Sequence, residues 1–201
     1  MKIIGVTGAI ATGKSTVSEF FRKLGAYVID LDKIVHLLLE KDLSIYKEVI
    51  SNFGKGILDR KGRIDRRRLS KKVFVNNKEL ENLCRVIHPA VIRSLKNRLD
   101  EIGRKTPESI VIVDAPLLIE ADLLDLVDTV IVVKASRQNQ FKRGIKKLRL
   151  SRKDIEKRMN SQIPLTEKER FADFIIDNDS TRSNTEVQVK RIFDIVNRRG
   201  L

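Results

Sequence analysis

The sequence is short of cysteine, aromatic residues and long hydrophobic runs. Its 201 residues contain one cysteine, Cys84, and no tryptophan, and aromatic residues make up 5%. One cysteine excludes an internal disulfide framework and fits a reducing compartment. No apolar run reaches the length of a membrane span, and the N-terminal apolar stretch is too short and too often interrupted by glycine for a targeting segment. We therefore expect a cytoplasmic protein without a membrane segment.

Positive charge is in excess, with a formal net charge of +14. Such a balance suits nucleic acid, a membrane surface or a polyanionic small molecule. The basic residues are spread along the chain, which favours ordinary solvated charge, and a functional basic cleft is the alternative. Few aromatic side chains leave little material for stacking single-stranded bases. The composition therefore weakens the case for a single-stranded nucleic-acid partner.

Residues 8–15 fit the phosphate-loop pattern G-x-x-x-x-G-K-S. An apolar β-rich segment, residues 2–7, precedes them, and a helical pattern with one apolar face, residues 16–24, follows. A strand, a glycine-bounded loop and a helix N-terminus arrange backbone N–H groups around an anion. Lys14 would reach the β- and γ-phosphates, and the Ser15 hydroxyl would ligate Mg²⁺. The flanking elements disfavour a chance glycine-rich turn, so the sequence predicts a nucleotide-binding protein.

Apolar segments predict the fold class. Five of them are expected as strands: residues 2–7, 26–30, 109–114, 129–134 and 173–177. Because these runs do not alternate with polar residues, they indicate strands covered on both faces, as in a parallel sheet. Helical patterns separate them, as parallel crossovers require. We therefore predict an α/β fold with a doubly wound five-stranded parallel sheet, whose ligands lie at the carboxyl ends of the strands.

Two long intervals between strands predict helical insertions within a single domain, 1–201. The core would comprise residues 1–31, 109–134 and 171–201. A helical insert, residues 32–108, would hold the phosphate acceptor, and a basic helical lid, residues 135–170, would close over ATP, as in small P-loop kinases. Helical patterns are expected at residues 34–40, 42–53, 65–75, 78–104 and 183–198. Pro89 is expected to break or restart the helix at 78–104.

Acidic residues follow two of the expected strands. Asp32, after the second strand, could accept a hydroxyl proton during phosphoryl transfer, or it could cap a helix starting near Lys33. Asp30 has the same alternatives, with a structural role at least as well supported. Asp114 ends the third strand and is either a metal-associated carboxylate or a turn-forming residue.

Polar residues of the two insertions supply further candidates. Gln140, Arg143 and Lys147 share a helix face, where the cations could stabilise a transferring phosphoryl group or form a solvated charged surface. His88, a lone histidine in the expected helix 78–104, is more often structural than catalytic.

The motifs together resemble one family, the dephospho-CoA kinases, over nearly the whole chain. They occupy residues 4–17, 28–34, 53–54, 62–66, 85–89, 114–120, 140–143, 160–162 and 172–178. The set Asp-x-Asp, His-Pro, Pro-Leu-Leu-x-Glu and Ile-Asp-Asn in this order is far more specific than the phosphate loop alone. The resemblance implies ATP- and Mg²⁺-dependent phosphorylation of the ribose 3′-hydroxyl of dephospho-CoA.

The resemblance also implies residue roles. Asp32 becomes the general base, and Lys14, Arg143 and Lys147 act on the γ-phosphate. The ATP site comprises Gly8, Ala11, Thr12, Gly13, Lys14, Ser15, Thr16 and Asn178, with Asn178 near the adenine. The substrate side comprises Asp32, Arg66, His88 and Leu117, and Ser15 is the metal ligand.

This chain departs from the family pattern at Lys147, where an arginine is usual, and in a phosphate loop with less glycine and serine. Lysine lacks the bidentate fork of arginine. A nucleoside or nucleotide kinase and, with less support, a nucleic-acid-binding P-loop protein are the alternative functions. The implied partners are ATP and dephospho-CoA, without a membrane, and we expect a monomer although the sequence leaves an oligomer open.

Overall fold

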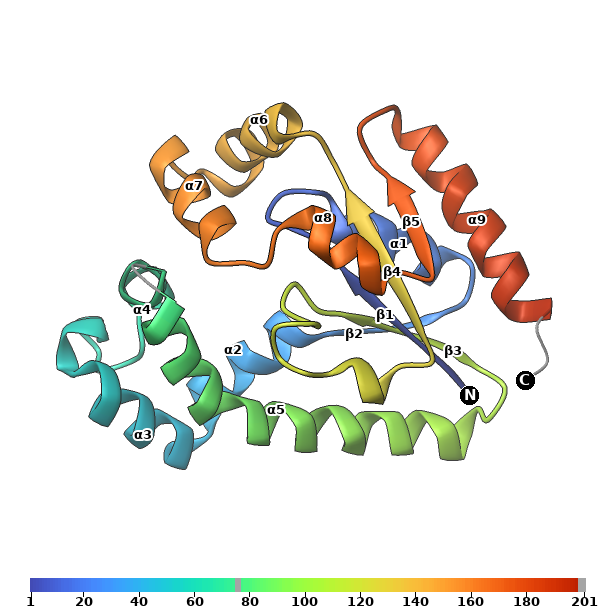
Figure 1. Cartoon of the computed structure of the whole chain (residues 1–201). Helices are drawn as coiled ribbons and strands as arrows, with labels where there is room; N and C mark the ends of the chain where they lie inside the picture. The colour runs from blue at the N-terminus through green and yellow to red at the C-terminus, as the bar shows by residue number, and fades with distance from the viewer. Residues whose placement is uncertain (75–76, 199–201) are drawn as a thin grey trace. The chain divides into compact units, whose positions relative to one another are not determined.

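Five parallel strands form one sheet in the order β2-β3-β1-β4-β5 (Figure 1). The structure is a computed structural model, and it describes residues 1–74 and 77–198. The strands are β1 (Lys2–Thr7), β2 (Tyr27–Asp30), β3 (Ile110–Asp114), β4 (Thr129–Lys134) and β5 (Phe174–Asp177). The predicted α/β fold with a five-stranded parallel sheet is confirmed, with β2, β3 and β5 starting slightly later than expected.

The sheet belongs to a compact unit made of Met1–Asp30 and the chain from Leu99 onward. Helices α1 (Lys14–Lys23) and α9 (Arg182–Arg198) lie side by side and pack on one sheet face (Figure 1). Phe20 and Phe21 of α1 and Val189 of α9 meet strand residues such as Ile112 and Ile131 in one apolar core. The alternate residues of β3 and β4 are buried as well, which explains why these strands read as continuous apolar runs.

The strand order brings several loops to one edge of the sheet. Central β1 pairs with β3 through Val6 and Asp114, and with β4 through Thr7 and Val132. The loop after β1 therefore starts between the ends of β3 and β4. This is the carboxyl edge at which parallel α/β sheets bind ligands.

The segment after β4, predicted from the sequence to form a lid, contains α6 (Arg137–Leu148) and α7 (Arg152–Asn160), followed by α8 (Leu165–Lys168) and η3 (Glu169–Phe171). Serine side chains cap α6 and α7, since Ser136 and Ser151 accept from amides of the first turns. A β-carbon on Gly144 would lie 2.6 Å from Ile155 Cδ1, so glycine permits close approach of the two helices. A short 3-10 turn, η2 (Leu124–Leu126), lies between β3 and β4.

The second compact unit, Leu31–Arg98, is helical. It contains α2 (Leu31–Lys41), α3 (Leu43–Phe53), η1 (Lys55–Ile57), α4 (Arg66–Val73) and α5 (Asn77–Lys105), which extends beyond it. The expected end of a helix at residue 75 lies outside the described residues. Asp42 and Asp65 cap α3 and α4 by accepting from amides of the first turns.

The prediction that Pro89 breaks its helix is wrong, because Pro89 lies inside α5. A proline removes one backbone donor and crowds the carbonyl one turn earlier. On either side of it, Val86, Ile87, Ala90 and Val91 are buried. Burial of this apolar face outweighs the local cost, since helices in proteins draw most of their stability from packing.

Among the helices that the structure describes, none is long and apolar enough to cross a membrane.

Candidate active site

The phosphate loop joins β1 to α1 and has a bent backbone. Gly8 and Gly13 have φ angles of 151° and 100°, and Ala11 adopts 59° although it carries a β-carbon. Thr12 closes the loop internally, with its hydroxyl 2.9 Å and its amide 3.3 Å from the carbonyl oxygen of Ala9. Because α1 begins at Lys14, its first amides have no acceptor within the helix and are available to an anion.

Lys14, Ser15 and Thr16 form the first turn of α1, directly after the loop. The Lys14 ammonium donates to the carbonyl oxygen of Gly8 at 3.3 Å, so it lies over the loop. Ser15 is exposed and Thr16 half-buried on the first turn. The loop and this turn therefore bring Gly8, Ala11, Thr12, Gly13, Lys14, Ser15 and Thr16 together.

Asn178 follows β5 and contacts the loop directly. Its side-chain amide donates to the carbonyl oxygen of Thr12 at 2.6 Å, while its own oxygen accepts from the Thr185 hydroxyl at 2.8 Å. Asn178 and Thr185 are both buried. Thr185 therefore fixes which way the amide points, and a β-carbon on Gly13 would collide with Asn178 Nδ2.

Arg143 of α6 reaches the same place from the lid. Its guanidinium donates to the carbonyl oxygen of Thr12 at 3.1 Å and to that of Asn178. Asp179 anchors the start of α6 by accepting from the amides of Ser136 at 2.7 Å and of the Asn139 side chain at 2.9 Å. Burial raises the pKa of Asp179, but these hydrogen bonds and the charge of Arg143 outweigh it and leave the pKa below the ordinary value.

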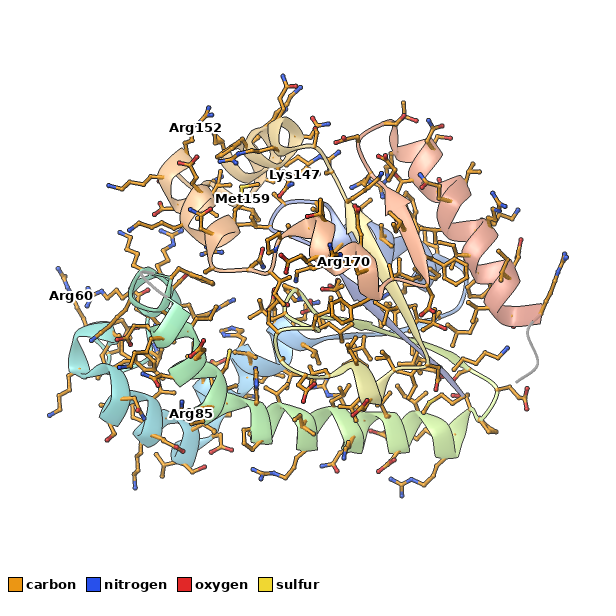
Figure 2. All side chains as sticks on the ribbon, viewed as in Figure 1. Arg60, Arg85, Lys147, Arg152, Met159 and Arg170 are labelled. Atoms are coloured by element: carbon orange, nitrogen blue, oxygen red, sulfur yellow. The ribbon has the colours of Figure 1, made fainter. Side chains whose placement is uncertain are left out.

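The predicted helix face of Gln140, Arg143 and Lys147 is graded in exposure. Gln140 is buried and donates to the carbonyl oxygen of Ala135 at 2.9 Å, whereas Arg143 is half-buried. Lys147 is exposed in the last turn of α6 (Figure 2). Of the lid cations proposed from the sequence, Arg143 contacts the loop in this structure. Arg149 ends α6 in a left-handed conformation and is not part of this face.

Asp114 lies at the end of β3, in register with Val6 of β1 and Asp30 of β2. The Ser18 hydroxyl, one turn after Lys14, donates to its carboxylate at 2.8 Å, and both side chains are buried. Ser18 lies outside the loop motif, so the motif gives no signal for this contact. The pair connects α1 to the neighbouring strand and sets a carboxylate beside the start of that helix.

A buried ion pair is a feature that the sequence did not indicate. The Lys168 ammonium lies 2.7 Å from Glu120 Oε1 and donates to the carbonyl oxygen of Pro116 at 2.8 Å. The Lys168 side chain is 0% exposed. Burial lowers the pKa of Lys168, whereas Glu120 raises it and Lys14 lowers it further. One lysine in a chain with 41 lysines and arginines offers no local signal of such a role.

Residues proposed for the acceptor lie on several elements. Within the unit Leu31–Arg98, Asp32 belongs to the first turn of α2, Arg66 starts α4 and His88 lies in α5. Leu117 lies in the turn after β3, in the other unit. Because α2 begins at Leu31, Asp32 lies within the first turn of the helix and not at the position before its first residue. Burial lowers the pKa of His88, which favours the neutral imidazole.

Comparisons with known proteins point to one family. The profile of the CoaE family, described as dephospho-CoA kinase, matches residues 2–184. The chain is 39% identical to a dephospho-CoA kinase of Aquifex aeolicus, covering 98% of this chain and 99% of the relative. A crystal structure of a Thermus thermophilus protein superposes with a TM-score of 0.80 at 30% identity, covering 97% of each chain. A dephospho-CoA kinase from Campylobacter jejuni gives a TM-score of 0.70 at 28% identity over 100% of both chains. The chain belongs to the dephospho-CoA kinase family.

Proposed function

We propose that this protein transfers the γ-phosphoryl group of ATP to the ribose 3′-hydroxyl of dephospho-CoA, giving coenzyme A and ADP. The observation that carries the proposal is the phosphate loop at the carboxyl end of central β1, in a chain matched by the family profile over residues 2–184. Phosphoryl transfer needs little covalent chemistry from a protein and depends on positioning and charge stabilisation. The loop, the helix N-terminus and the cations of this edge supply both.

On the ATP side, the amides that start α1 and the Lys14 ammonium would bind phosphate oxygens. Arg143 would stabilise charge on the transferring group, from a position already fixed on the loop by Thr12 and Asn178. Asn178 follows β5 beside the loop, and the adenine role implied by the resemblance stays a prediction.

Mg²⁺ fits the oxygen donors beside this loop. Ser15 presents an exposed hydroxyl on the first turn of α1, and Asp114 supplies a carboxylate that Ser18 orients from the same helix. Mg²⁺ prefers such oxygen ligands together with water and phosphate. When bound, the ion would neutralise charge on the phosphates. Ser15 is proposed as its direct ligand and Asp114 as the carboxylate that holds its water shell.

On the acceptor side, Asp32 is proposed to accept the proton of the attacking hydroxyl, and Arg66, His88 and Leu117 to bind the substrate. Asp32 is separated from the end of β2 by Leu31 alone, and its side chain is exposed. A substrate hydroxyl can therefore reach it. A monomeric state and a cytoplasmic location stay predictions from the sequence.

The test is to incubate the protein with ATP, Mg²⁺ and dephospho-CoA and to quantify coenzyme A against ADP. We expect one coenzyme A per ADP, with most turnover lost in Lys14→Ala and in Asp32→Asn. Asp32→Asn should keep ATP binding nearly intact, because it removes only the base. Wild-type turnover in Asp32→Asn would remove Asp32 from that role. ADP without coenzyme A, together with transfer to a nucleoside or nucleotide, would instead support the alternative kinase function.

A further inference from the structure

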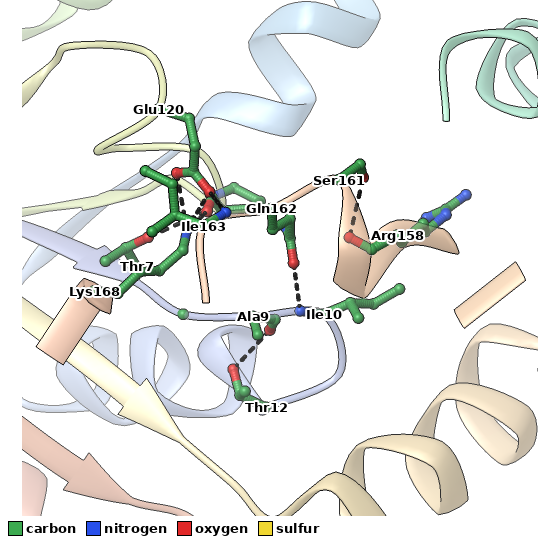
Figure 3. A network of polar contacts seen from close by, with 12 residues as sticks. Thr7, Ala9, Ile10, Thr12, Glu120, Arg158, Ser161, Gln162, Ile163 and Lys168 are labelled. Carbon is green, nitrogen blue, oxygen red and sulfur yellow. Dashed lines mark hydrogen bonds and ion pairs between the residues drawn. The ribbon is translucent and has the colours of Figure 1, made fainter. Parts of the chain in front are cut away.

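The ammonium of Lys168 lies among oxygen atoms of Glu120 and Pro116 (Figure 3). It lies 2.8 Å from the carbonyl oxygen of Pro116, 2.7 Å from Glu120 Oε1 and 2.9 Å from Glu120 Oε2. It donates hydrogen bonds to the Pro116 carbonyl oxygen and to Glu120 Oε2, and the Lys168 side chain is 0% exposed. Lys168 can therefore affect nucleotide binding only through the protein groups that it holds.

These groups belong to segments that border the phosphate loop. Glu120 Oε1 also accepts from the backbone amide of Ile163 at 3.0 Å. Residues 161–168, here called the strap, join α7 to η3, so Glu120 and Lys168 fasten the strap at two points to the turn after β3. The Pro116 carbonyl oxygen also accepts from the Thr7 hydroxyl at 3.2 Å, and Thr7 directly precedes the phosphate loop.

The strap contacts the loop through Gln162. Its side-chain oxygen accepts from the backbone amide of Ile10 at 3.0 Å (Figure 3). The Ile10 side chain packs against Phe141 and Ile155 of the lid helices. Ile10 is thus held by its side chain and by its amide, and the amide contact depends on where the strap lies.

The loop needs such external support because its conformation is locally unfavourable. Ala11, next to Ile10, has a φ of 59°. For a residue with a β-carbon, the left-handed region is sterically unfavourable. Conformations of this kind persist only where the surroundings impose them. The Gln162 contact lies directly beside the strained residue.

We propose that Lys168 is a positioning residue for ATP binding, which acts through Glu120 and the strap to hold Gln162 on the Ile10 amide. The inference rests on the proposed kinase function and concerns the same site. It accounts for an otherwise costly feature, since a fully buried lysine requires a paired charge. The charge of Lys14 contributes to the lowered pKa of Lys168, which places the two ammonium groups within electrostatic range of each other.

The test combines Lys168→Met, Gln162→Leu and the double variant in the full-length protein. ATP affinity is measured by calorimetric titration in the presence of Mg²⁺, and KM and kcat are measured alongside. We expect each single variant to weaken ATP binding about tenfold. The ATP affinity of the double variant should be at most about twofold below that of the single variant with the lower affinity, because both changes break the same series of contacts. Losses that multiply to about a hundredfold would overturn the proposal.

Thermal unfolding separates positioning from general destabilisation. A Lys168→Met protein that melts earlier but binds ATP like the wild type would also overturn the proposal. If Lys168→Met does not fold, Gln162→Leu decides, because Gln162 is only half-buried: wild-type ATP affinity in that variant contradicts the proposal. Lys190→Met is the matched control, since Lys190 is exposed on α9, and it should bind ATP like the wild type. An equal loss in Lys190→Met would mean that total charge, not position, is responsible.

The titration needs no acceptor, which keeps the two proposals apart. A wild-type protein that binds ATP but makes no coenzyme A would refute the proposed reaction and leave the test of Lys168 intact. Unchanged ATP affinity in all strap variants of an active kinase would refute the role of Lys168 alone.

Discussion

The side-chain amide of Asn178 lies 2.6 Å from the carbonyl oxygen of Thr12, although 166 positions separate the two residues in the chain. Asn178 is held in turn by Thr185 of α9 at 2.8 Å. The residue that follows β5 therefore contacts the phosphate loop directly. Gly13, between Thr12 and the first residue of α1, passes beneath this amide with no room for a side chain.

Gly13→Ala should abolish most ATP binding. The new β-carbon would collide with Asn178 Nδ2, and the φ of 100° disfavours any residue except glycine. We expect ATP affinity, measured by calorimetric titration, to fall by about a hundredfold or more, since the loop must shift to relieve the contact.

Gly25→Ala separates the two causes. Gly25 has a similar φ of 97° but nothing within 4 Å of an added β-carbon, so it carries the backbone strain without the collision. It should lower stability by about 1 kcal/mol and leave ATP affinity unchanged. Partial recovery of binding in Gly13→Ala/Asn178→Ala would confirm the collision, and an equal loss of ATP binding in Gly25→Ala would contradict it.

Ala11→Gly should stabilise the protein. The φ of 59° destabilises the folded state by about 1 kcal/mol for alanine but not for glycine. Glycine also has more conformational freedom in the unfolded chain, and this offsets part of the gain in stability. We expect the free energy of unfolding in chemical denaturation to rise by about 0.5 kcal/mol. Ala172→Gly is the control, because Ala172 has an ordinary φ of −86° and should lose stability. A loss of stability in both variants would show that the Ala11 backbone is unstrained.

The strands and the phosphate loop could be predicted because their signals are local. A run such as residues 110–113 is continuous and β-branched, and the loop motif lies within a few residues. Arg143 is predicted from its place on a helix face and Asn178 from the family resemblance, and the structure adds that both side chains donate to the Thr12 carbonyl oxygen. Residue spacing in the sequence does not reveal that the two side chains share this acceptor.

Other features follow from tertiary contacts that no local pattern encodes. Lys168 and Glu120 are 48 positions apart, and Ser18 and Asp114 are 96 apart. Pro89 shows the opposite failure, in which a strong local rule predicted a break and buried neighbours kept α5 continuous. Burial explains both Lys168 and Pro89. A buried lysine needs a charged partner, and the burial of neighbouring apolar residues compensates for a proline inside a helix.

His88→Gln should flatten the pH dependence of stability below about pH 6.5. Burial lowers the pKa of His88 from its usual 6.5, so below pH 6.5 the unfolded chain binds a proton that the folded chain resists. Stability from this group is present above pH 6.5 and is lost as pH falls towards the folded pKa, by at most about 1.4 kcal/mol per pH unit. Chemical denaturation at several pH values would measure the difference between wild type and variant.

The carboxylates with lowered pKa do not interfere in this window. The Ser44 hydroxyl holds the pKa of Asp42 below its usual 3.8, and the backbone amide of Arg63 does the same for Asp59. These groups lose their stabilising effect only at still lower pH. Parallel curves for wild type and His88→Gln as the pH falls below 6.5 would show that His88 protonates equally in both states.

Arg143→Met should reduce kcat far more than Lys147→Met. Arg143 spans the carbonyl oxygens of Thr12 and Asn178 with two nitrogens, whereas Lys147 is exposed in the last turn of α6. Loss of a transition-state arginine costs about 10³-fold or more in kcat, and we expect at most about a tenfold loss for the exposed lysine. Arg143→Lys should rescue little, since a lysine is a point charge that cannot span both carbonyls.

Single-turnover rates with saturating ATP, compared with separate ATP titrations, distinguish catalysis from binding. Lys142→Met, an exposed change on the same helix, should behave as wild type. A larger loss in Lys147→Met than in Arg143→Met would instead make Lys147 the lid cation that acts on the phosphoryl group, and would require α6 to move relative to the loop during turnover.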